Sequence, residues 1–227
     1  MIFNHTTSNY TFATTLAGSL AVSQTGSGST SLTGANTYTG GTTVSAGTLL
    51  VNNVTGSGTG TGDLTLASGA TLGGNGTIAG NATLTGILSP GTGLGTLTIG
   101  GNVTWNGDVS SAWQFTLGAS NGSDLLNSGG NFWKGTGTQF VFDFQSGASV
   151  GTFTLATWAG STTFTAADFS YTDLGGGHAG SFAINGQSLQ FTASAVPEPA
   201  TYAGLLGAVA LGATLLLRRR RTSSGRD

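Results

Sequence analysis

A possible nucleophile lies in the sequence GASVG, where Ser149 has the G-x-S-x-G spacing of a hydrolase serine. Asp168 or Asp173 and then His178 follow in the Ser, Asp, His chain order of α/β-hydrolases. That motif requires a sharp turn from a strand into a helix, whereas GASVG leads into the alternating sequence TFTLATW. A second match, GASNG, shows how readily this composition produces the pattern. We therefore expect a non-enzymatic chain with Ser149 in a surface loop.

The sequence offers few side chains or loops that could hold a metal or a cofactor. The chain has no cysteine, and His5 and His178 are its only histidines, so disulfides and sites made from several imidazoles are excluded. The stretch GTGTGDLTL at residues 58–66 resembles one calcium-binding solenoid nonapeptide, but it is not repeated in tandem. A solvated turn aspartate is the alternative. No glycine-rich phosphate loop lies between a strand and a helix, and we expect no cofactor.

A sugar site is conceivable at Trp133 and Lys134, where an indole ring could stack on a sugar and the lysine and nearby asparagines could bond to it. The alternative is that these residues serve the core, because Trp and Phe at alternating strand positions are more often buried. The sequence leaves both interpretations open.

Composition and charge narrow the classes of function. The chain has 227 residues with 41 glycines, and only 6% of its residues are charged. Five of its six basic residues lie in the last ten positions, so Lys134 alone opposes six aspartates up to residue 195. A surface of this kind cannot neutralise a phosphate backbone, and we expect no nucleic-acid binding. Regularly spaced aliphatic and aromatic residues argue for a buried interior rather than disorder.

Six-residue units begin at Asp63, in the order DLTLAS, GATLGG, NGTIAG and NATLTG. Each has Thr in its third place, an aliphatic residue in its fourth and a small residue in its sixth. Short strands joined at Gly or Asn turns accommodate this pattern, whereas each Gly would cost about 1 kcal/mol in a helix interior. The repeat therefore predicts a β-solenoid whose coils stack aliphatic residues on one another.

The stretch SLTGANTYTGGTTVSAGTLLVNN, Ser31 to Asn53, resembles the autotransporter-associated β-strand repeat. That resemblance implies a parallel β-helix on an exported, cell-surface protein, although the chain has no room for the membrane β-barrel of true autotransporters. The hexads also fit the hexapeptide pattern of left-handed β-helices, many of which are acyltransferases, so the handedness stays open.

Aromatic residues gather beyond Val103, where all four Trp and ten of the twelve Phe lie. Alternating segments such as QFVFDF place Phe140, Phe142 and Phe144 on one face. We expect longer antiparallel strands here that cap the solenoid or form a small sandwich.

The tail consists of three parts in order: VPEP at Val196, Pro197, Glu198 and Pro199, an uncharged run from Ala200 to Leu217, and four arginines, Arg218, Arg219, Arg220 and Arg221. As a helix, the run would extend about 27 Å, close to the hydrocarbon thickness of a bilayer. The arginines would stay on the cytoplasmic side. Gly204, Ala208 and Gly212 recur every fourth residue and offer a smooth face to another helix, unless small residues are merely tolerated there.

This order resembles the PEP-CTERM sorting signal of Gram-negative bacteria. The resemblance implies that an exosortase, a membrane cysteine transpeptidase, recognises Pro197, Glu198 and Pro199 and cleaves near them. It further implies tethering to the inner membrane during sorting, then a place on the cell surface or outside it, in biofilm-forming organisms that produce exopolysaccharide. The body would be a structural protein of the surface or matrix, or alternatively an exopolysaccharide-binding module.

The first residues, MIFNHTTSNYTF, lack the basic and apolar regions of a secretory signal peptide. We therefore expect that the start codon is misassigned or that the sequence is the C-terminal part of a longer protein. The predicted fold is all-β, a parallel β-solenoid followed by aromatic-rich antiparallel strands and one C-terminal transmembrane helix. The predicted divisions are an N-terminal β segment, the solenoid, the cap or sandwich, the sorting signal and a cytoplasmic tail, at residues 1–30, 31–108, 109–195, 196–221 and 222–227.

Overall fold

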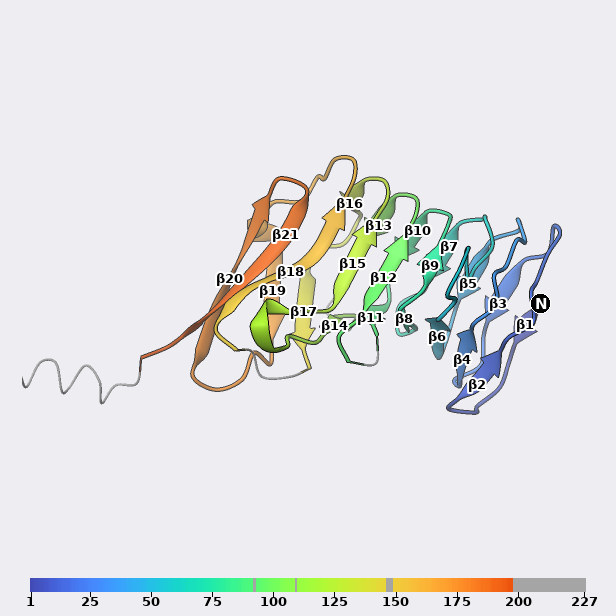
Figure 1. Cartoon of the computed structure of the whole chain (residues 1–227), viewed down its shortest axis with the longest axis horizontal. Coiled ribbons are helices and arrows are strands. Elements are labelled where there is room, and N and C mark those ends of the chain that lie inside the picture. The colour runs from blue at the N-terminus through green and yellow to red at the C-terminus, as the bar shows by residue number, and fades with distance from the viewer. Residues whose placement is uncertain (92, 109, 146–148, 198–227) are drawn as a thin grey trace, which may run out of the picture.

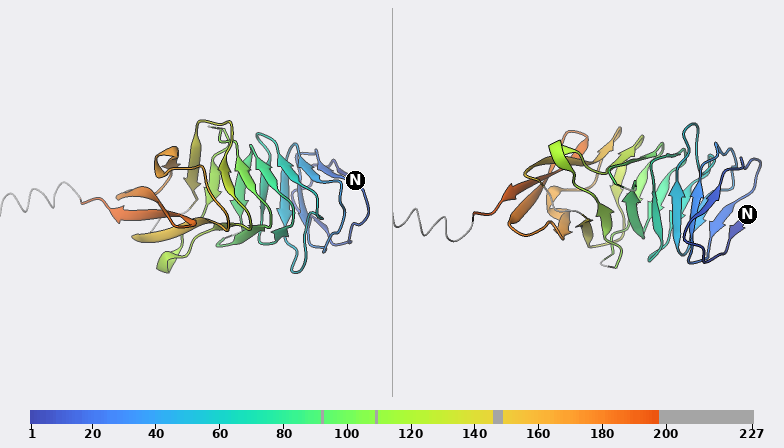
Figure 2. Two further views of the ribbon diagram at one scale, coloured as in Figure 1. Left: turned by 90° about the horizontal axis from the view of Figure 1, so that it is seen from above. Right: turned by 60° about the horizontal axis from the view of Figure 1, so that its bottom comes forward.

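The computed structural model describes residues 1–91, 93–108, 110–145 and 149–197. These residues form an all-β structure with almost no helix (Figure 1). Successive passes of the chain, called coils here, pair in parallel: Val22 pairs with Thr42, Thr42 with Leu64, and Leu64 with Ala82. The coils follow one another along a single long axis in all views (Figures 1 and 2). The chain begins at one end of this stack, and β20 and β21 lie at the other.

The described strands form four sheets. The first three coils pass through sheets A and B, and the next two pass through sheets A, B and C in turn. Sheet A contains β1 (Ile2–Phe3), β3 (Val22–Gln24), β5 (Thr42–Val44), β7 (Leu64–Leu66), β10 (Ala82–Leu84), β13 (Val103–Trp105) and β16 (Phe132–Lys134). Sheet B contains β2 (Tyr10–Phe12), β4 (Ser29–Leu32), β6 (Thr48–Val51), β8 (Thr71–Gly74) and β11 (Ile87–Pro90).

The other two sheets include the later strands. Sheet C contains β9 (Thr77–Ile78), β12 (Thr96–Ile99), β15 (Leu125–Ser128), β18 (Gly151–Trp158), β21 (Ser188–Ala195) and β20 (His178–Asn185). Sheet D contains β14 (Trp113–Phe115), β17 (Phe140–Phe144) and β19 (Phe169–Thr172), and β14 lies beside β11 of sheet B. Two short 3₁₀ turns are η1 (Ala119–Asn121) and η2 (Ala166–Asp168).

The six-residue units each supply one side of a coil. DLTLAS contains β7, GATLGG β8, NGTIAG β9 and NATLTG β10. After three units the chain returns to sheet A, where Leu64 pairs with Ala82 and Leu66 with Leu84. The fourth residue of each unit points inward, because its exposed fraction is 0% in all four cases, namely Leu66, Leu72, Ile78 and Leu84. The predicted stacking of aliphatic residues is thus confirmed.

A row of polar side chains links the coils at the corner before sheet A. The Asp63 Oδ1 atom accepts a hydrogen bond from the Asn81 backbone N–H at 3.0 Å. The Oδ1 atom of Asn81 accepts from the N–H of Asn102 at 2.8 Å, and that of Asn102 from the N–H of Asn131 at 2.9 Å. Asn131 accepts in turn from Ser161 at 2.8 Å. The row satisfies backbone donors where the chain turns and no strand partner is in reach.

The strands beyond residue 109 pair differently from the prediction. Among the described strands, the expected antiparallel pairing is confirmed for β18 with β21 and for β21 with β20. The strands β13 and β16 pair in parallel, as do β14, β17 and β19, so the parallel winding continues well past residue 109. Alternation of buried and exposed residues has the same period in parallel and antiparallel strands, which is why it did not separate the two.

The core changes from aliphatic to aromatic along the stack. Trp105 and Trp113 are both 0% exposed, and their rings stack with centroids 3.6 Å apart and an interplanar angle of 12°. Phe142 meets both indoles edge-on, with centroid distances of 5.5 and 6.0 Å. The coil that begins at Val103 is longer than the preceding ones, since Val103 pairs with Phe132. Larger rings fill the wider interior at the close packing that protein cores require.

No helix within the described residues is long and apolar enough to cross a membrane. The predicted transmembrane segment, residues 200–217, lies outside those residues.

Candidate functional site

The candidate sorting site begins where the last strand ends. β21 lies between β18 and β20, and its final residue, Ala195, pairs with His178. The next residue, Val196, donates its backbone N–H to the Gly177 carbonyl oxygen at 2.8 Å, and its side chain is 48% exposed. Pro197 follows and has no N–H with which to continue the pairing. The predicted recognition sequence therefore starts at the edge of the folded body (Figure 1).

The remainder of that predicted site lies outside the described residues. This applies to the other two motif residues, to the membrane-spanning run, to its small residues and to the arginines, namely Glu198, Pro199, Ala200 to Leu217, Gly204, Ala208, Gly212 and Arg218 to Arg221. Their roles stay predictions.

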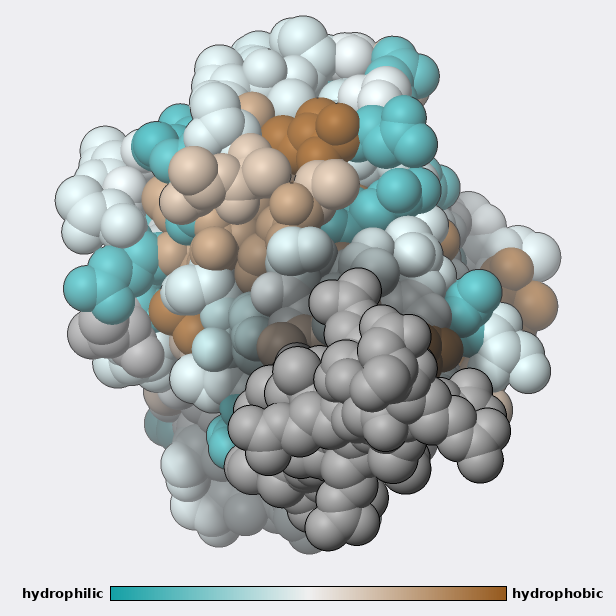
Figure 3. Space-filling view, turned by 90° about the vertical axis from the view of Figure 1, so that its left-hand side faces the viewer, coloured by the Kyte–Doolittle hydropathy of each residue, from teal (hydrophilic) through white to brown (hydrophobic). Residues whose placement is uncertain are grey.

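The end of the molecule that holds the β20–β21 hairpin faces the viewer in Figure 3. Apolar residues gather in the upper part of this view between patches of polar ones. The terminal strands are not uniformly apolar, because burial alternates along β20, where Phe182 and Ile184 pack on the core and the residues between them are exposed. This alternation fits strands that cover one end of the stack.

Residues 195–221 match a family model described as the PEP-CTERM protein-sorting motif. The chain carries a PEP-CTERM sorting motif. The motif indicates an exported or surface-associated protein that depends on an exosortase for processing. The predicted resemblance of the tail is thereby confirmed.

A second family model, the passenger-associated-transport-repeat, matches residues 22–51. Its bounds coincide with strand ends, because Val22 is the first residue of β3 and Val51 is the last residue of β6. The predicted autotransporter-associated repeat is confirmed, although the match begins upstream of Ser31, where the sequence placed it. No curated protein matches the chain in a sequence search.

Asn36 joins three coils within the passenger repeat. Its Oδ1 atom accepts a hydrogen bond from the backbone N–H of Leu16 at 2.7 Å, in the preceding coil. Its Nδ2 atom donates to the carbonyl oxygen of Gly58 at 2.6 Å, in the following coil. The side chain is 3% exposed. The first three coils have no strand on this side, and the Asn36 amide adds to the backbone bonds that join them there, such as those from Asn36 N–H to Ser57 and from Thr37 N–H to Leu16.

A buried glutamine shapes the first turn of the repeat. Gln24, with an exposed fraction of 0%, donates from Nε2 to the carbonyl oxygens of Gly26 at 3.0 Å and Gly28 at 3.2 Å. The Thr30 hydroxyl donates to its Oε1 atom at 2.7 Å. Gly47 lies against the same turn with φ +65°, and a Cβ atom there would collide with the carbonyl oxygens of Gly26 and Gly28. Only glycine accepts both the positive φ and the close approach of these carbonyl oxygens.

Tyr38 shows how the repeat buries a polar aromatic residue. The ring is 0% exposed, and its hydroxyl lies 2.6 Å from the Thr42 hydroxyl. Burial raises the pKa of Tyr38 to about 12, against the weaker lowering effect of the Thr42 hydrogen bond. The phenol therefore stays protonated at physiological pH and acts as a structural hydrogen-bonding group.

The residues of the hydrolase hypothesis make other contacts. The Ser149 hydroxyl donates to the carbonyl oxygen of Gly118 at 3.2 Å, not to an imidazole. GASVG leads into the strand β18, as the sequence predicted, so the strand-to-helix turn of a nucleophile is replaced by a strand. Asp168 is engaged by Lys134. Both matched families are a sorting signal and a repeat, and neither is a catalytic family.

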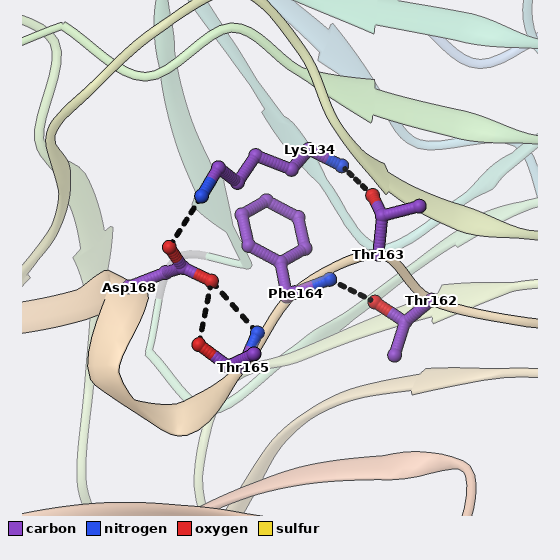
Figure 4. Close-up of polar contacts among 6 residues, drawn as sticks. All are labelled: Lys134, Thr162, Thr163, Phe164, Thr165 and Asp168. Carbon is purple, nitrogen blue, oxygen red and sulfur yellow. Dashed lines mark hydrogen bonds and ion pairs between the residues drawn. The ribbon is translucent and has the colours of Figure 1, made fainter.

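Lys134 and Asp168 fasten the loop that covers the last strand of sheet A (Figure 4). The Lys134 Nζ atom lies 2.5 Å from Asp168 Oδ1, and it also lies 5.9 Å from the centre of the Phe140 ring. The Lys134 backbone N–H donates to the Thr163 hydroxyl at 2.8 Å. Asp168 Oδ2 accepts from the backbone N–H of Thr165 at 2.7 Å. Lys134, and secondarily the Thr165 N–H, lower the pKa of the Asp168 carboxyl below its usual value.

Trp133 remains available, whereas Lys134 does not. Trp133 is 37% exposed, while the other three tryptophans are 0 to 4% exposed. It lies on the outer face of β16, beside a lysine that is already paired. Of the predicted sugar-binding pair, Lys134 is held in an ion pair and the indole is not.

Sequence reasoning described the role of Asp63 incompletely and missed the role of Asp124. Asp63 begins the corner row, and within the described residues no three His, Cys, Asp or Glu side chains come together at one point. Asp124, 2% exposed, accepts from the backbone N–H groups of Gly95 at 2.8 Å and Thr116 at 2.7 Å. Burial raises the pKa of the Asp124 carboxyl, and these hydrogen bonds oppose the rise. Nothing in the local sequence separates Asp124 from the exposed aspartates.

Proposed function

We propose that the chain is a non-enzymatic structural protein of the cell surface or extracellular matrix, built as a β-solenoid and delivered by exosortase cleavage of its tail. The observation that carries this proposal is the PEP-CTERM motif at residues 195–221, directly after the last strand of the body. The passenger repeat at residues 22–51 and the parallel pairing of successive coils support the solenoid part of the proposal.

In this proposal each part of the tail has a separate role. The exosortase recognises Val196, Pro197, Glu198 and Pro199, because two prolines hold the segment extended and keep it out of the helix that follows. The run from Ala200 to Leu217 stops export in the inner membrane, and its small residues at Gly204, Ala208 and Gly212 face a helix of the enzyme. The arginines at positions 218–221 hold the orientation.

The body acts as a passive spacer in the matrix. Its coils are held by backbone pairing and by side-chain rows such as the one from Asp63 to Ser161. Each coil needs its neighbours to bury its apolar residues, so neighbouring coils hold one another in place along the stack. A rigid rod suits a scaffold between cell surface and matrix.

The proposal is tested by expressing the gene from its native locus, with its upstream DNA, in hosts with and without the exosortase. Intact mass spectrometry then gives the C-terminus of the mature chain. We expect loss of the arginines at positions 218–221 only in the host that contains the enzyme. Retention of these arginines in both hosts would overturn the sorting proposal and favour a permanent single-pass anchor.

The second candidate function is the binding of exopolysaccharide. The observation that favours it is Trp133, which is 37% exposed on the outer face of sheet A. A glycan array that retains the wild-type chain but not Trp133→Ala would support this function.

A further inference from the structure

The outer face of sheet A presents a column of hydroxyl groups in strict register. Thr43 pairs with Thr65, Thr65 with Thr83, and Thr83 with Thr104, so that one threonine of each coil stands directly beside the next. We name these four residues the threonine column. Thr104 pairs in turn with Trp133, which continues the column on the next coil. Parallel strands are about 4.8 Å apart, so the row from Thr43 to Trp133 extends over about 19 Å.

The hydroxyls of the threonine column are free. Among the described residues they have no hydrogen-bond partner. Sheet C differs, since Thr157 there donates to Asn127 at 3.0 Å and Thr152 lies 3.0 Å from Thr192. The corner amides beside the column are also occupied, as the links from Asn81 to Asp63 show.

A polar hollow lies at one end of the threonine column. It has a volume of about 310 Å³ and borders Thr43 and Thr65. Gly41, which has φ +81°, and Asp63 of the next coil also line it. The Asp63 Oδ1 atom accepts two hydrogen bonds from Asn81 at 3.0 Å, which leaves Oδ2 to accept from a ligand hydroxyl.

The charge of this face selects the class of ligand. Lys134 is the only basic residue before residue 218, and it is paired with Asp168. The threonine column carries no charge, and Asp63 adds a negative one beside the hollow. An anionic polymer would find no cation here to replace its counter-ions. A neutral chain rich in hydroxyl groups can bond to both donors and acceptors of the column and stack an apolar ring face on an indole.

We infer that the outer face of sheet A binds a linear, neutral polysaccharide that lies along the threonine column and stacks one ring on Trp133. A pyranose unit in an extended chain is about as long as the spacing between strands, so successive sugars meet successive threonines. The inference rests on the second candidate function above and gives it a site. It is independent of how the exosortase processes the tail.

The test uses the purified full chain and linear hexasaccharides of β-1,4-glucose, β-1,3-glucose and β-1,4-mannose, with a polygalacturonate hexamer as the acidic comparator. Dissociation constants are measured by titration calorimetry. We expect binding to at least one neutral hexamer and weaker binding to the acidic one. Trp133→Ala raises the dissociation constant about tenfold, through loss of stacking. The double variant Thr65→Val and Thr83→Val raises it by a similar factor, about tenfold, through loss of two hydrogen bonds.

The control is the double variant Thr11→Val and Thr96→Val, which removes exposed strand hydroxyls from sheets B and C. It leaves the dissociation constant unchanged. Circular dichroism and the melting temperature confirm that each variant is folded. Valine keeps the shape and the strand preference of threonine, so only the hydroxyl is removed.

Four outcomes would overturn the inference. The first is that no neutral hexamer binds, which also removes the second candidate function. The second is that Trp133→Ala weakens binding while the threonine double variant does not, which leaves that function but assigns another site. The third is equal binding of the acidic hexamer. The fourth is self-association of the wild type in ultracentrifugation that Trp133→Ala abolishes, without glycan binding, which would assign the face to a second copy of the chain.

Discussion

The Val196 backbone N–H donates to the Gly177 carbonyl oxygen at 2.8 Å, and Pro197 follows at once. The strand that precedes this bond is held on both sides, by β18 and by β20. The PEP-CTERM motif therefore extends directly from a supported strand, without a long linker. An enzyme that reads the motif must approach the end of the folded body, where the β20–β21 hairpin lies.

Replacing both prolines, Pro197→Ala with Pro199→Ala, is expected to leave most chains unprocessed in a host that contains the exosortase. Alanine restores a backbone N–H at each position and permits conformations that proline forbids, so the segment loses its extended bias and its exclusion from strand and helix pairing. The measurement is the fraction of chains that retain residues 218–221, by intact mass. Thr192→Val in β21 is the matched control and should be processed as the wild type is. Normal processing of the proline variant would contradict the prediction.

Asn36→Ala should lower the free energy of unfolding by about 1 to 3 kcal/mol, because it leaves the Leu16 N–H and the Gly58 carbonyl oxygen without their partner inside the fold. Urea unfolding followed by circular dichroism measures the loss through the midpoint, with the slope unchanged. Asn185→Ala, at an exposed position before the β20–β21 turn, is the control and should change stability by less than about 0.5 kcal/mol. An equal loss in both variants would show that Asn36 does not link the coils.

Much of the winding could be predicted from the six-residue units, because the fourth residue of each unit faces inward and its Gly or Asn residues mark the corners of the coil. Leu66 and Leu72 follow this rule, and both are fully buried. The role of Asn36 could not be predicted, since its partners lie in the coils before and after it and are backbone groups that leave no trace in the sequence.

The link between Lys134 and Asp168 makes part of the stability depend on pH. The Asp168 pKa in the folded chain is below the usual value of 3.8, because Lys134 and the Thr165 N–H favour the charged form. Between the two pKa values the unfolded chain binds more protons than the folded one, so stability rises with pH there. This contribution is complete above pH 3.8 and is lost as the pH falls toward the folded value.

Asp168→Asn should therefore lower the melting temperature slightly at pH 7, by an amount equivalent to at most about 1 kcal/mol, since the pair is near the surface. The difference from the wild type should shrink as the pH falls from 7 to 3. The carboxyl of Asp124, whose pKa burial raises, acts in the opposite sense, but it is present in both chains and cancels in the comparison. A difference that stays constant or grows at low pH would refute this assignment.

The candidate site was accessible to sequence reasoning only where its residues are contiguous. The sorting motif is a continuous stretch, and both its order and its place were predicted. In the sequence, the threonine column was visible only as the threonine in the third place of each six-residue unit. The alignment of Thr43, Thr65 and Thr83 depends on coil lengths, and these vary from one coil to the next. The same variation concealed that Lys134 faces Asp168.

Replacing Trp113 and replacing Trp133 should have very different effects on the free energy of unfolding. Trp113→Ala removes a ring that is 0% exposed and stacked on Trp105, and it should cost about 3 to 5 kcal/mol. Trp133→Ala removes a ring that is 37% exposed and should change the free energy of unfolding by no more than about 0.5 kcal/mol.

Trp113→Phe tests whether the loss in Trp113→Ala comes from packing. The Trp113 Nε1 atom has no hydrogen-bond partner among the described residues, so phenylalanine removes a buried polar group together with part of the ring. It should therefore cost clearly less than alanine. Urea unfolding of all three variants gives the comparison. If Trp133→Ala were as destabilising as Trp113→Ala, Trp133 would be part of the core, and its role as a stacking surface for a sugar would be lost.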